Sequence, residues 1–354
     1  MMKLEKLRAA LQESGVDALL ITNENSRRYM TGFTGTAGVA IVSQQDAVFI
    51  TDFRYTEQAA SQVRDFRIVQ HTKTLVEEVA TQVEAMGIKS LGFEKEDVSY
   101  ATYEVYKKAV SADLVPLAGL VEKIRLIKTD EEISIIKAAC RIADEAYEHI
   151  VTYIKPGMTE LDVSNELEFF MRKRGATSSS FDIIVASGTR SALPHGVATE
   201  KIIEDGDFVT LDFGALYKGY ISDTTRTLAV GEPSDQLKEI YQVVLEAQLL
   251  ALEKIKPGMT GKEADAIARD YIASKGYGDA FGHSLGHGIG LEVHEGPGLS
   301  FRSNVVLEPG MIITIEPGIY LPNIGGVRIE DDALVTETGL EKLTHSTKEL
   351  LILK

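Results

Sequence analysis

The chain has 354 residues, 44 % of them hydrophobic and 25 % charged, a composition typical of a globular protein with about two domains. Its formal net charge of -16 argues against partners such as nucleic acids and anionic membrane surfaces, which it would repel. The N-terminus lacks an apolar signal core, no later run is long enough to cross a bilayer, and Cys140 is the single cysteine. These features are consistent with a reducing cytoplasm, where we expect the protein to reside.

The first 124 residues alternate helical and strand patterns, which predicts a layered α/β domain. The expected elements are helices at Lys3–Ser14, Glu77–Met86 and Ala101–Val110, and strands at Ala18–Ile21, Gly38–Val42, Ala47–Ile50 and Ser90–Phe93. Two polar clusters, Asn23–Tyr29 and Asp52–Arg54, carry no spacing that indicates chemistry. We expect them to form turns and surface or subunit contacts.

A domain boundary is expected near Arg125. Thr129 and Glu132 form a T-x-x-E capping box, which predicts a long helix from about Asp130 to Tyr153. The chain is therefore expected to consist of one domain at 1–124 and a second at 125–354. Cys140 falls within the long helix, where a small buried apolar residue is the simplest interpretation.

The second region contains an internal repeat. The sequence IKPGMT occurs at residues 154–159 and again at 255–260, an offset of 101 residues. In each copy it ends one helix and precedes another, at Glu160–Arg174 and Gly261–Lys275. A glycine-rich segment with a histidine and then a β-hairpin with two acids follow each time. We therefore predict two related α+β halves that face each other across a pseudo-two-fold axis.

The four hairpin acids are Asp212 and Asp223 in the first half and Glu316 and Glu330 in the second. If each hairpin closes symmetrically, Asp212 lies opposite Asp223, and Glu316 roughly opposite Glu330. Opposed positions bring Cβ atoms to about 4.5–5.5 Å, where like charges repel and need cations between them. Because Glu330 is followed by Asp331 and Asp332, strand alternation favours either Glu330 or Asp332 as a ligand and disfavours Asp331.

Four carboxylates and one neutral imidazole suit two divalent ions, of the type Mn²⁺, Co²⁺, Fe²⁺ or Zn²⁺. Two such ions about 3.5–4 Å apart would share a water, lower its pKa and polarise a carbonyl, which describes a metal-assisted hydrolase. His287 lies between Gly286 and Gly288, which allow close backbone approach. Three other histidines stand alone in polar surroundings and are expected at the surface: His71, His149 and His345.

Several stretches closely resemble the pita-bread metallopeptidases, which include Xaa-Pro dipeptidase (prolidase), aminopeptidase P, methionine aminopeptidase and metal-free creatinase. They read LPHG, TLDFGALYKGYISDTTRT, GHSLGHGIGLEVHE, MIITIEPGIY and GVRIEDD, and they cover most of residues 125–354. Upstream, RYMTGFTGTAG and ITDFRYTEQA resemble the creatinase-type domain of the proline-specific members. The resemblance implies an α/β creatinase-like domain followed by an α+β pita-bread catalytic domain.

The resemblance also implies roles for single residues. The metal ligands would be Asp212, Asp223, His287, Glu316 and Glu330, with Glu316 also the general base. His195, His283 and His294 match histidines around the metals that bind substrate and assist catalysis, His294 by steadying the intermediate or moving protons to the departing proline nitrogen. Arg328 would hold a ligand carboxylate or contact substrate. Arg302 stands where prolidases place an arginine for the substrate carboxylate.

The expected function is hydrolysis of the bond before proline in small peptides with proline in second position. Xaa-Pro dipeptidase is preferred because the chain has compact prolidase length, and aminopeptidase P is the alternative. Methionine aminopeptidases lack the upstream domain, and creatinase lacks the metal ligands. A non-catalytic binding protein with the same fold is a remote third possibility. The family further implies a homodimer, with Mn²⁺ as the first expectation for the metal and Co²⁺ or Zn²⁺ as alternatives.

Overall fold

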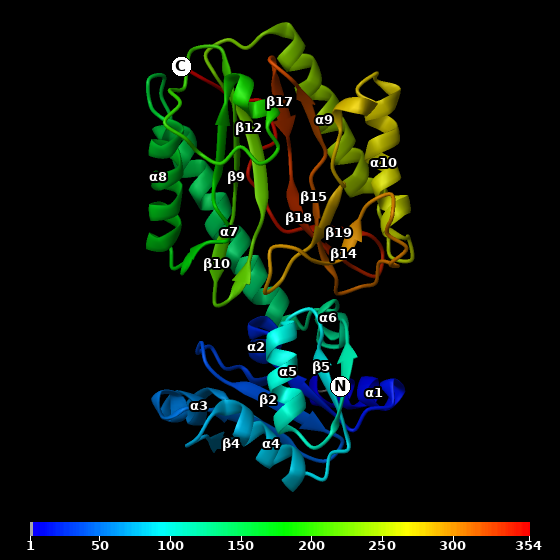
Figure 1. Cartoon of the computed structure of the whole chain (residues 1–354). Coiled ribbons are helices and arrows are strands. Elements are labelled where there is room, and N and C mark those ends of the chain that lie inside the picture. Colours follow the sequence, from blue (N-terminus) through cyan, green and yellow to red (C-terminus); the bar gives the residue numbers. More distant parts are fainter. Residues whose placement is uncertain (1–2) are drawn as a thin grey trace. The chain divides into compact units, whose positions relative to one another are not determined.

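The computed structural model describes residues 3–354, and the chain divides into two compact units, Met1–Arg125 and Leu126–Lys354 (Figure 1). Among the described residues, no helix is both long enough and apolar enough to span a membrane.

The first unit is built on a six-stranded mixed sheet in the order β4-β3-β2-β1-β5-β6. The strands are β1 (Ala18–Ile21), β2 (Val39–Ser43), β3 (Ala47–Thr51), β4 (Arg67–Gln70), β5 (Ser90–Glu94) and β6 (Asp113–Leu117). The helices are α1 (Lys3–Ser14), α2 (Glu24–Thr31), α3 (Thr56–Gln62), α4 (Leu75–Ala85), α5 (Tyr100–Ala109) and α6 (Leu120–Arg125). All seven elements expected from the sequence are present, each within a residue or two of its expected ends.

The expectation for Asn23–Tyr29 is wrong, because this segment belongs to helix α2. The side-chain oxygen of Asn23 accepts hydrogen bonds from the N–H groups of Asn25 and Ser26, both at 3.0 Å, and so caps the helix. Arg27 is buried and donates to two backbone carbonyls of the following loop at 2.9 Å. The polar composition of this segment did not indicate a helix, because the charged residue Arg27 faces the interior of the unit. Asp52–Arg54 lies at the start of the short 3-10 helix Phe53–Tyr55, where Asp52 is the cap and the Arg54 side chain is exposed.

The second unit contains two larger sheets, ordered β20-β12-β9-β8 and β14-β13-β15-β18-β19. Its helices are α7 (Asp130–Tyr153), α8 (Glu160–Lys173), α9 (Asp235–Lys254) and α10 (Gly261–Ser274). Its strands are β7 (Ser178–Ser179), β8 (Ile184–Ser187), β9 (Asp207–Phe213), β10 (Ala215–Tyr217), β11 (Tyr220–Ile221), β12 (Thr224–Val230), β13 (Gly286–Gly288), β14 (Glu295–Leu299), β15 (Ile312–Ile315), β16 (Gly318–Leu321), β17 (Gly325–Arg328), β18 (Asp331–Val335), β19 (Leu340–Lys342) and β20 (Ile352–Leu353). The helices α7, α8 and α10 follow the sequence prediction closely.

The two copies of IKPGMT form the same turn. Gly157 and Gly258 have φ angles of +91° and +89°, a conformation that glycine adopts without strain. The Gly157 N–H donates to the carbonyl of Ile203 at 2.9 Å, and the Gly258 N–H donates to that of Leu307 at 2.8 Å. The repeat seen in the sequence is therefore reproduced at the level of single hydrogen bonds.

The helices that follow the repeat begin in the same way. Thr159 caps α8 and Thr260 caps α10, each through a capping box with an acid three residues later. The helix pair α7–α8 packs with strands β8, β9 and β12 in one hydrophobic core, and the pair α9–α10 packs with β15 to β18 in another. Figure 1 shows the strands of both halves between these two helix pairs.

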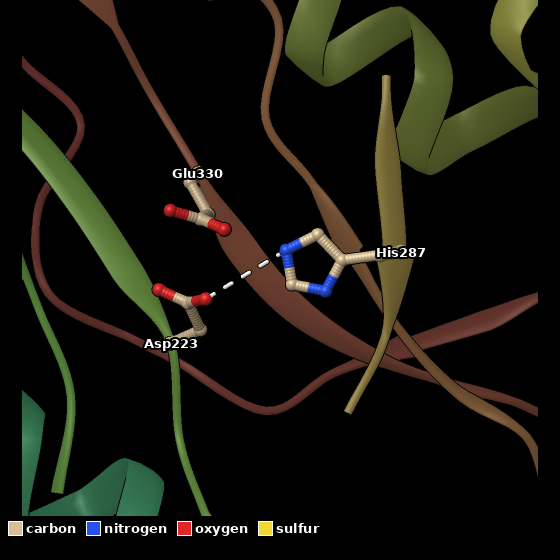
Figure 2. A group of neighbouring side chains, drawn as sticks. All are labelled: Asp223, His287 and Glu330. Atoms are coloured by element: carbon tan, nitrogen blue, oxygen red, sulfur yellow. Dashed lines mark ion pairs between the residues drawn. The ribbon is translucent and has the colours of Figure 1, made fainter. Parts of the chain in front are cut away.

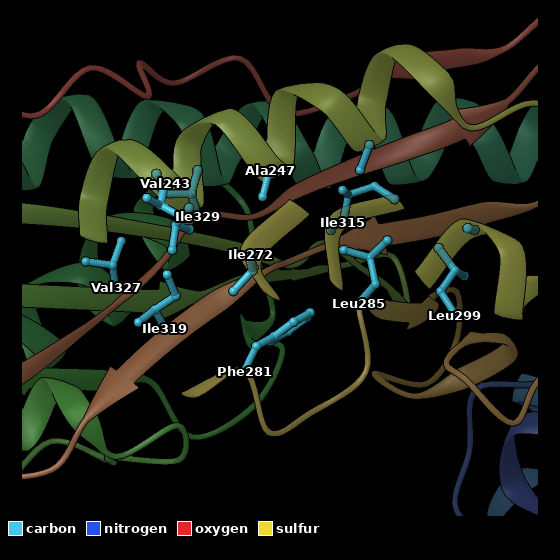
Figure 3. Packing of buried hydrophobic residues seen from close by; sticks show 14 of the residues in the cluster. Val243, Ala247, Ile272, Phe281, Leu285, Leu299, Ile315, Ile319, Val327 and Ile329 are labelled. Carbon is cyan, nitrogen blue, oxygen red and sulfur yellow. The ribbon is translucent and has the colours of Figure 1, made fainter. Parts of the chain in front are cut away.

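The core of the second half supports the strands that carry Glu316 and Glu330. Figure 3 shows Val243 and Ala247 of α9 in the same hydrophobic cluster as Ile315 and Ile329. In the chain, Ile315 directly precedes Glu316 and Ile329 directly precedes Glu330. These four side chains are buried, and burying one of the larger ones stabilises the fold by about 1.5–3 kcal/mol. The apolar side chains therefore hold the backbone on which the acids are displayed.

Candidate metal centre

The first two acids lie at the end of the strand pair β9–β12. Asp212 is the penultimate residue of β9 and pairs with Thr225, whereas Asp223 immediately precedes β12. The expectation that Asp212 lies directly opposite Asp223 is therefore wrong by two residues. The cause is the position of the turn. The strands β10 and β11 continue the register of β9 and β12, and the hairpin closes at Lys218–Gly219, one residue beyond the midpoint between Asp212 and Asp223.

The second two acids lie just beyond the strand pair β15–β18. Ile315 pairs with Asp331, so Glu316 and Glu330 are the next residues in the same register, as the symmetric hairpin predicted. His287 is the central residue of β13, whose Gly288 pairs with Ile313 of β15. This pairing brings the imidazole to the same end of the sheet as the two glutamates.

Asp223, His287 and Glu330 meet across the two halves. Each offers a ligand atom, and the three atoms lie within 4.8 Å of one another. Figure 2 shows the two carboxylates and the imidazole pointing toward a common centre. The Nε2 of His287 lies 3.8 Å from Asp223 Oδ2 and 3.3 Å from Glu316 Oε1. This spacing is suited to metal coordination.

The charges of this cluster are unbalanced. Burial, followed by repulsion from Glu330, raises the pKa of Asp223 well above its ordinary value. Burial, followed by the charge of Glu316, does the same to the pKa of Glu330, and burial raises the pKa of Asp212. The buried carboxylates favour either protons or cations beside them.

Glu316 and His287 behave differently because they face each other. Burial opposes ionisation of Glu316, but the hydrogen bond and positive charge of His287 outweigh burial and lower its pKa. Burial is the largest single influence on the pKa of His287 and lowers it, but the hydrogen bond and charge of Glu316, the Gly288 carbonyl and the charge of Asp332 together raise this pKa. A divalent ion would take the place of the imidazolium charge.

The residues present fit a divalent cation. The Oδ1 atom of Asp212 is buried without a hydrogen-bond partner, which is costly unless another group satisfies it. Carboxylate oxygens with one imidazole nitrogen are donors that Mn²⁺, Co²⁺ and Zn²⁺ accept.

Hydroxyl groups that the sequence analysis did not single out orient the acids. Thr225 Oγ1 donates to Glu330 Oε2 at 2.6 Å, and Thr314 Oγ1 donates to Glu316 Oε1 at 3.1 Å. The Thr314 hydroxyl also accepts from the backbone N–H of His287 at 3.1 Å. Strand alternation places Thr314 on the face of Glu316, a signal that could have identified it.

Arg328 contacts a ligand candidate directly. Its Nη2 donates to Asp212 Oδ2, its Nε to Thr225 Oγ1 at 3.1 Å, and its Nη1 to the Tyr320 hydroxyl at 2.8 Å. Tyr320 in turn lies 2.9 Å from His283 Nε2. These bonds hold the guanidinium in place. Tyr320 was missed as a member of this network, although it lies in the quoted stretch MIITIEPGIY.

The three consecutive acids Glu330, Asp331 and Asp332 have different surroundings. Asp331 points away from the cluster to Arg226 and Lys348, which outweigh burial and hold its pKa below its ordinary value. Asp332 Oδ2 accepts from the N–H of Asp223 at 2.9 Å and from the Cys140 thiol at 3.3 Å. Burial raises the pKa of Asp332 to about 8. Cys140 is buried as expected, but it has a polar partner.

A cavity of about 580 Å³ surrounds the centre. All five predicted ligands line it, together with the predicted residues His195, His283, His294 and Arg328. Burial lowers the pKa of His283 and of His294. Apolar side chains complete the wall: Phe181, Ile184, Pro194, Val197 and Val293.

Arg302 is not among the residues that line this cavity. Its side chain is exposed and its guanidinium lies over the Phe301 ring, 4.9 Å from the ring centroid. Of the three histidines expected at the surface, His345 is exposed and His71 is half-buried. His149 does not stand alone, because it is 2.6 Å from Glu166 and stacks on an aromatic ring between α7 and α8.

Comparison with known proteins agrees with this geometry. The model of the Metallopeptidase family M24 matches residues 134–337, and that of the Creatinase/Prolidase N-terminal domain matches residues 3–127. The chain belongs to metallopeptidase family M24. The family and its upstream domain confirm the fold predicted from the sequence and identify the protein as a metallopeptidase.

M24 proteins similar to this chain include three that it matches over nearly their whole length. A structure of the Xaa-Pro dipeptidase from Bacillus anthracis has 65% identity and a TM-score of 0.98, with 99% of each chain covered. The Xaa-Pro dipeptidase of Pyrococcus horikoshii is 43% identical, with 99% of this chain and 98% of the relative covered. A structure of the X-Pro aminopeptidase from Thermotoga maritima has 42% identity and a TM-score of 0.92, covering 99% of this chain and 100% of the other.

Proposed function

We propose that this M24 protein is an Xaa-Pro dipeptidase, which hydrolyses the peptide bond before proline in dipeptides. The observation that carries the proposal is the convergence of buried acids and His287 in one cavity of the second unit. Near-full-length similarity to proteins named Xaa-Pro dipeptidase supports the choice of substrate.

The five ligand candidates would hold two divalent ions, with Mn²⁺ as the first expectation and Co²⁺ or Zn²⁺ as alternatives: Asp212, Asp223, His287, Glu316 and Glu330. Such ions, when bound, supply a water of lowered pKa and polarise the substrate carbonyl. The chain's own residues must then orient the dipeptide and move protons.

Glu316 is suited to accept a proton. Its pKa is lowered despite burial, so the carboxylate is ionised at neutral pH, and Thr314 orients it through the bond to Oε1. The proline nitrogen carries no hydrogen in the tertiary amide and must be protonated to leave. His294 lines the same cavity, and we assign it the delivery of that proton or the stabilisation of the intermediate.

Other cavity residues position the substrate. The apolar walls formed by Phe181, Ile184 and Val197 can contact the side chain before the scissile bond and exclude water. His195 and His283 offer hydrogen bonds to the peptide. The Arg328 guanidinium is committed to Asp212 and Tyr320, so we assign it to orienting a ligand. Arg302 remains the candidate for the substrate carboxylate, since its exposed guanidinium has room to move.

The test compares an Xaa-Pro dipeptide with the matching Xaa-Pro-Xaa tripeptide, with Mn²⁺ supplied. Cleavage of the dipeptide alone supports the proposal, and the dipeptide of Xaa and alanine should resist as the matched control. Preference for the tripeptide identifies an aminopeptidase P, the alternative that similarity to the Thermotoga maritima enzyme favours. Activity that survives EDTA would contradict a metal-dependent reaction.

We further propose that residues 1–124 and 125–354 act as two domains and that the protein is a cytoplasmic homodimer. Limited proteolysis near residue 125 tests the boundary. Light scattering coupled to gel filtration tests the oligomeric state, with the mass of one chain, 38.7 kDa, as the reference.

A further inference from the structure

The loop between β13 and β14 carries His294 along the wall of the cavity. The centroid of the His294 ring lies 4.4 Å from the centroid of the ring of the ligand candidate His287. The carbonyl of Gly290 accepts the N–H of Ile221 at 2.9 Å, which ties the start of the loop to the segment that carries Asp223. The placement of His294 therefore depends on how the loop as a whole is held.

Glu295, the residue after His294, stabilises the loop through hydrogen bonds to the loop backbone. Its Oε1 accepts hydrogen bonds from the N–H groups of Leu291 at 2.7 Å and Glu292 at 3.0 Å. A Cβ atom at Gly290 would lie 2.7 Å from both carboxylate oxygens of Glu295, closer than real Cβ contacts allow. The carboxylate is thus packed against the turn and fixes the backbone directly before His294.

Lys128 supplies the opposite charge. Its Nζ lies 3.4 Å from Glu295 Oε2, and the two side chains are only 2% and 6% exposed. A buried carboxylate without a counter-charge is costly, and the ammonium of Lys128 supplies that charge beside Glu295. The Lys128 backbone is fixed as well, since its N–H donates to the carbonyl of Gly310 at 2.9 Å.

We propose that Lys128 and Glu295 form a positioning pair that holds the His294 side chain in its position on the cavity wall, where it acts on the substrate. Neither residue lines the cavity, so the pair acts through the loop and not on the substrate. The inference rests on the function proposed for His294. A misplacement of about 1 Å in such a group can cost about 100-fold in rate.

The test is a double-mutant cycle with Lys128→Met and His294→Ala, assayed on an Xaa-Pro dipeptide under steady-state conditions. His294→Ala alone tests the proposed role of His294. We expect Lys128→Met to lower kcat by about 10- to 100-fold with KM nearly unchanged, because it disturbs a group that acts in the transition state. In the His294→Ala background the same change should cost less than about 2-fold, because nothing remains to be positioned.

The outcomes separate the two proposals. If His294→Ala is fully active, the role of His294 fails. If His294→Ala is impaired and Lys128→Met lowers kcat equally in both backgrounds, or in neither, the positioning pair is overturned. Bound metal must stay at the wild-type level in both variants, since metal loss would show that Lys128 acts on the ligands instead and would also overturn the pair.

Two further variants guard against a general loss of folding. Lys137→Met removes an exposed ion pair of the same type, Lys137 with Glu341, and should leave kcat unchanged. If Lys128→Met does not fold, Glu295→Gln takes its place, because its amide oxygen can still accept the loop N–H groups while its amide nitrogen opposes Lys128. The cycle with His294→Ala is then read in the same way.

Discussion

At the level of single residues, the candidate metal centre contains carboxyl groups whose charged form has a lower free energy in water than in the protein interior. Asp223 and Glu330 are nearly fully buried, 5% and 2% exposed, and their charges repel each other. Thr225 donates a hydrogen bond to one oxygen of Glu330, whereas Arg328 donates to Thr225 and to Asp212. We therefore infer that these residues serve cation binding at a cost to stability, and their replacement should change function more than folding.

The first prediction concerns Asp212. Asp212→Asn removes a charged ligand candidate on which ion binding depends, so bound metal and activity should both fall, activity by more than about 100-fold, the upper end for residues that only support ligands. The first unit should stay folded. Metal analysis and dipeptide hydrolysis measure the effect. Asp207→Asn, on the same strand but outside the cavity, is the control, and wild-type turnover in Asp212→Asn would refute the ligand assignment.

The second prediction concerns protons. Because the pKa values of Asp223 and Glu330 are raised, these carboxyls hold protons when no cation balances them, and binding a cation must expel those protons. Apparent metal affinity should therefore rise with pH and weaken as pH falls through the raised pKa values. Titration calorimetry in buffers of different ionisation enthalpy counts the released protons. Metal binding without proton release at pH 7 would contradict the raised pKa values.

At the level of secondary-structure elements, the two halves owe their similarity to local geometry. Each half needs a left-handed glycine before a threonine cap, so that one helix ends and the next begins against the same sheet. The long β9–β12 and β15–β18 pairs then bring acids to their ends. A defect in one turn should therefore destabilise its own half.

The third prediction tests this turn. Gly258→Ala introduces a Cβ at a φ of +89° and should destabilise the protein by about 1–2 kcal/mol. For a unit of this size that corresponds to a fall of about 2–8 °C in Tm. Gly157→Ala, at φ +91°, should behave alike, whereas Gly298→Ala, with nothing within 4 Å of the added Cβ and no left-handed φ, is the control. Equal Tm values for Gly258→Ala and Gly298→Ala would show that the turn carries no strain.

At the level of the whole molecule, all five ligand candidates belong to the unit Leu126–Lys354. Ion binding can therefore stabilise this unit directly, while the unit Met1–Arg125 has its own sheet and core. If these residues hold the ions as proposed, the stability of one unit should depend on metal and that of the other should not.

The fourth prediction follows from this division. An ion supplied at about 100 times its Kd adds about 2.7 kcal/mol to the stability of the unit that binds it. Chelation should then lower the Tm of the second unit by about 5–10 °C and leave the transition of the first unit in place. Differential scanning calorimetry with and without EDTA measures both. A parallel fall of both transitions would show that the two units unfold as one.

The sequence by itself determined the features that depend on near neighbours in the chain. Capping boxes, apolar periodicity and the IKPGMT repeat placed α1, α7, α8 and α10 closely. The family motifs identified the five ligand candidates, three histidines and Arg328 in the cavity, but not its apolar wall, and Arg302, which they also indicated, is not among the residues that line it. Local patterns suffice here because caps and turns are made by residues three or four positions apart. Helix α2 was not predicted because three of its five buried residues are polar: Ser26, Arg27 and Thr31.

Only the tertiary structure decided the long-range relations. The offset of Asp212 from Asp223 depends on the hairpin β10–β11, which alternation within one strand cannot show. The same holds for the pair Lys128 and Glu295, which are 167 residues apart in the chain and lie next to each other only in the folded structure. Register and burial are set by packing between distant segments, and packing is what places these charges beside each other.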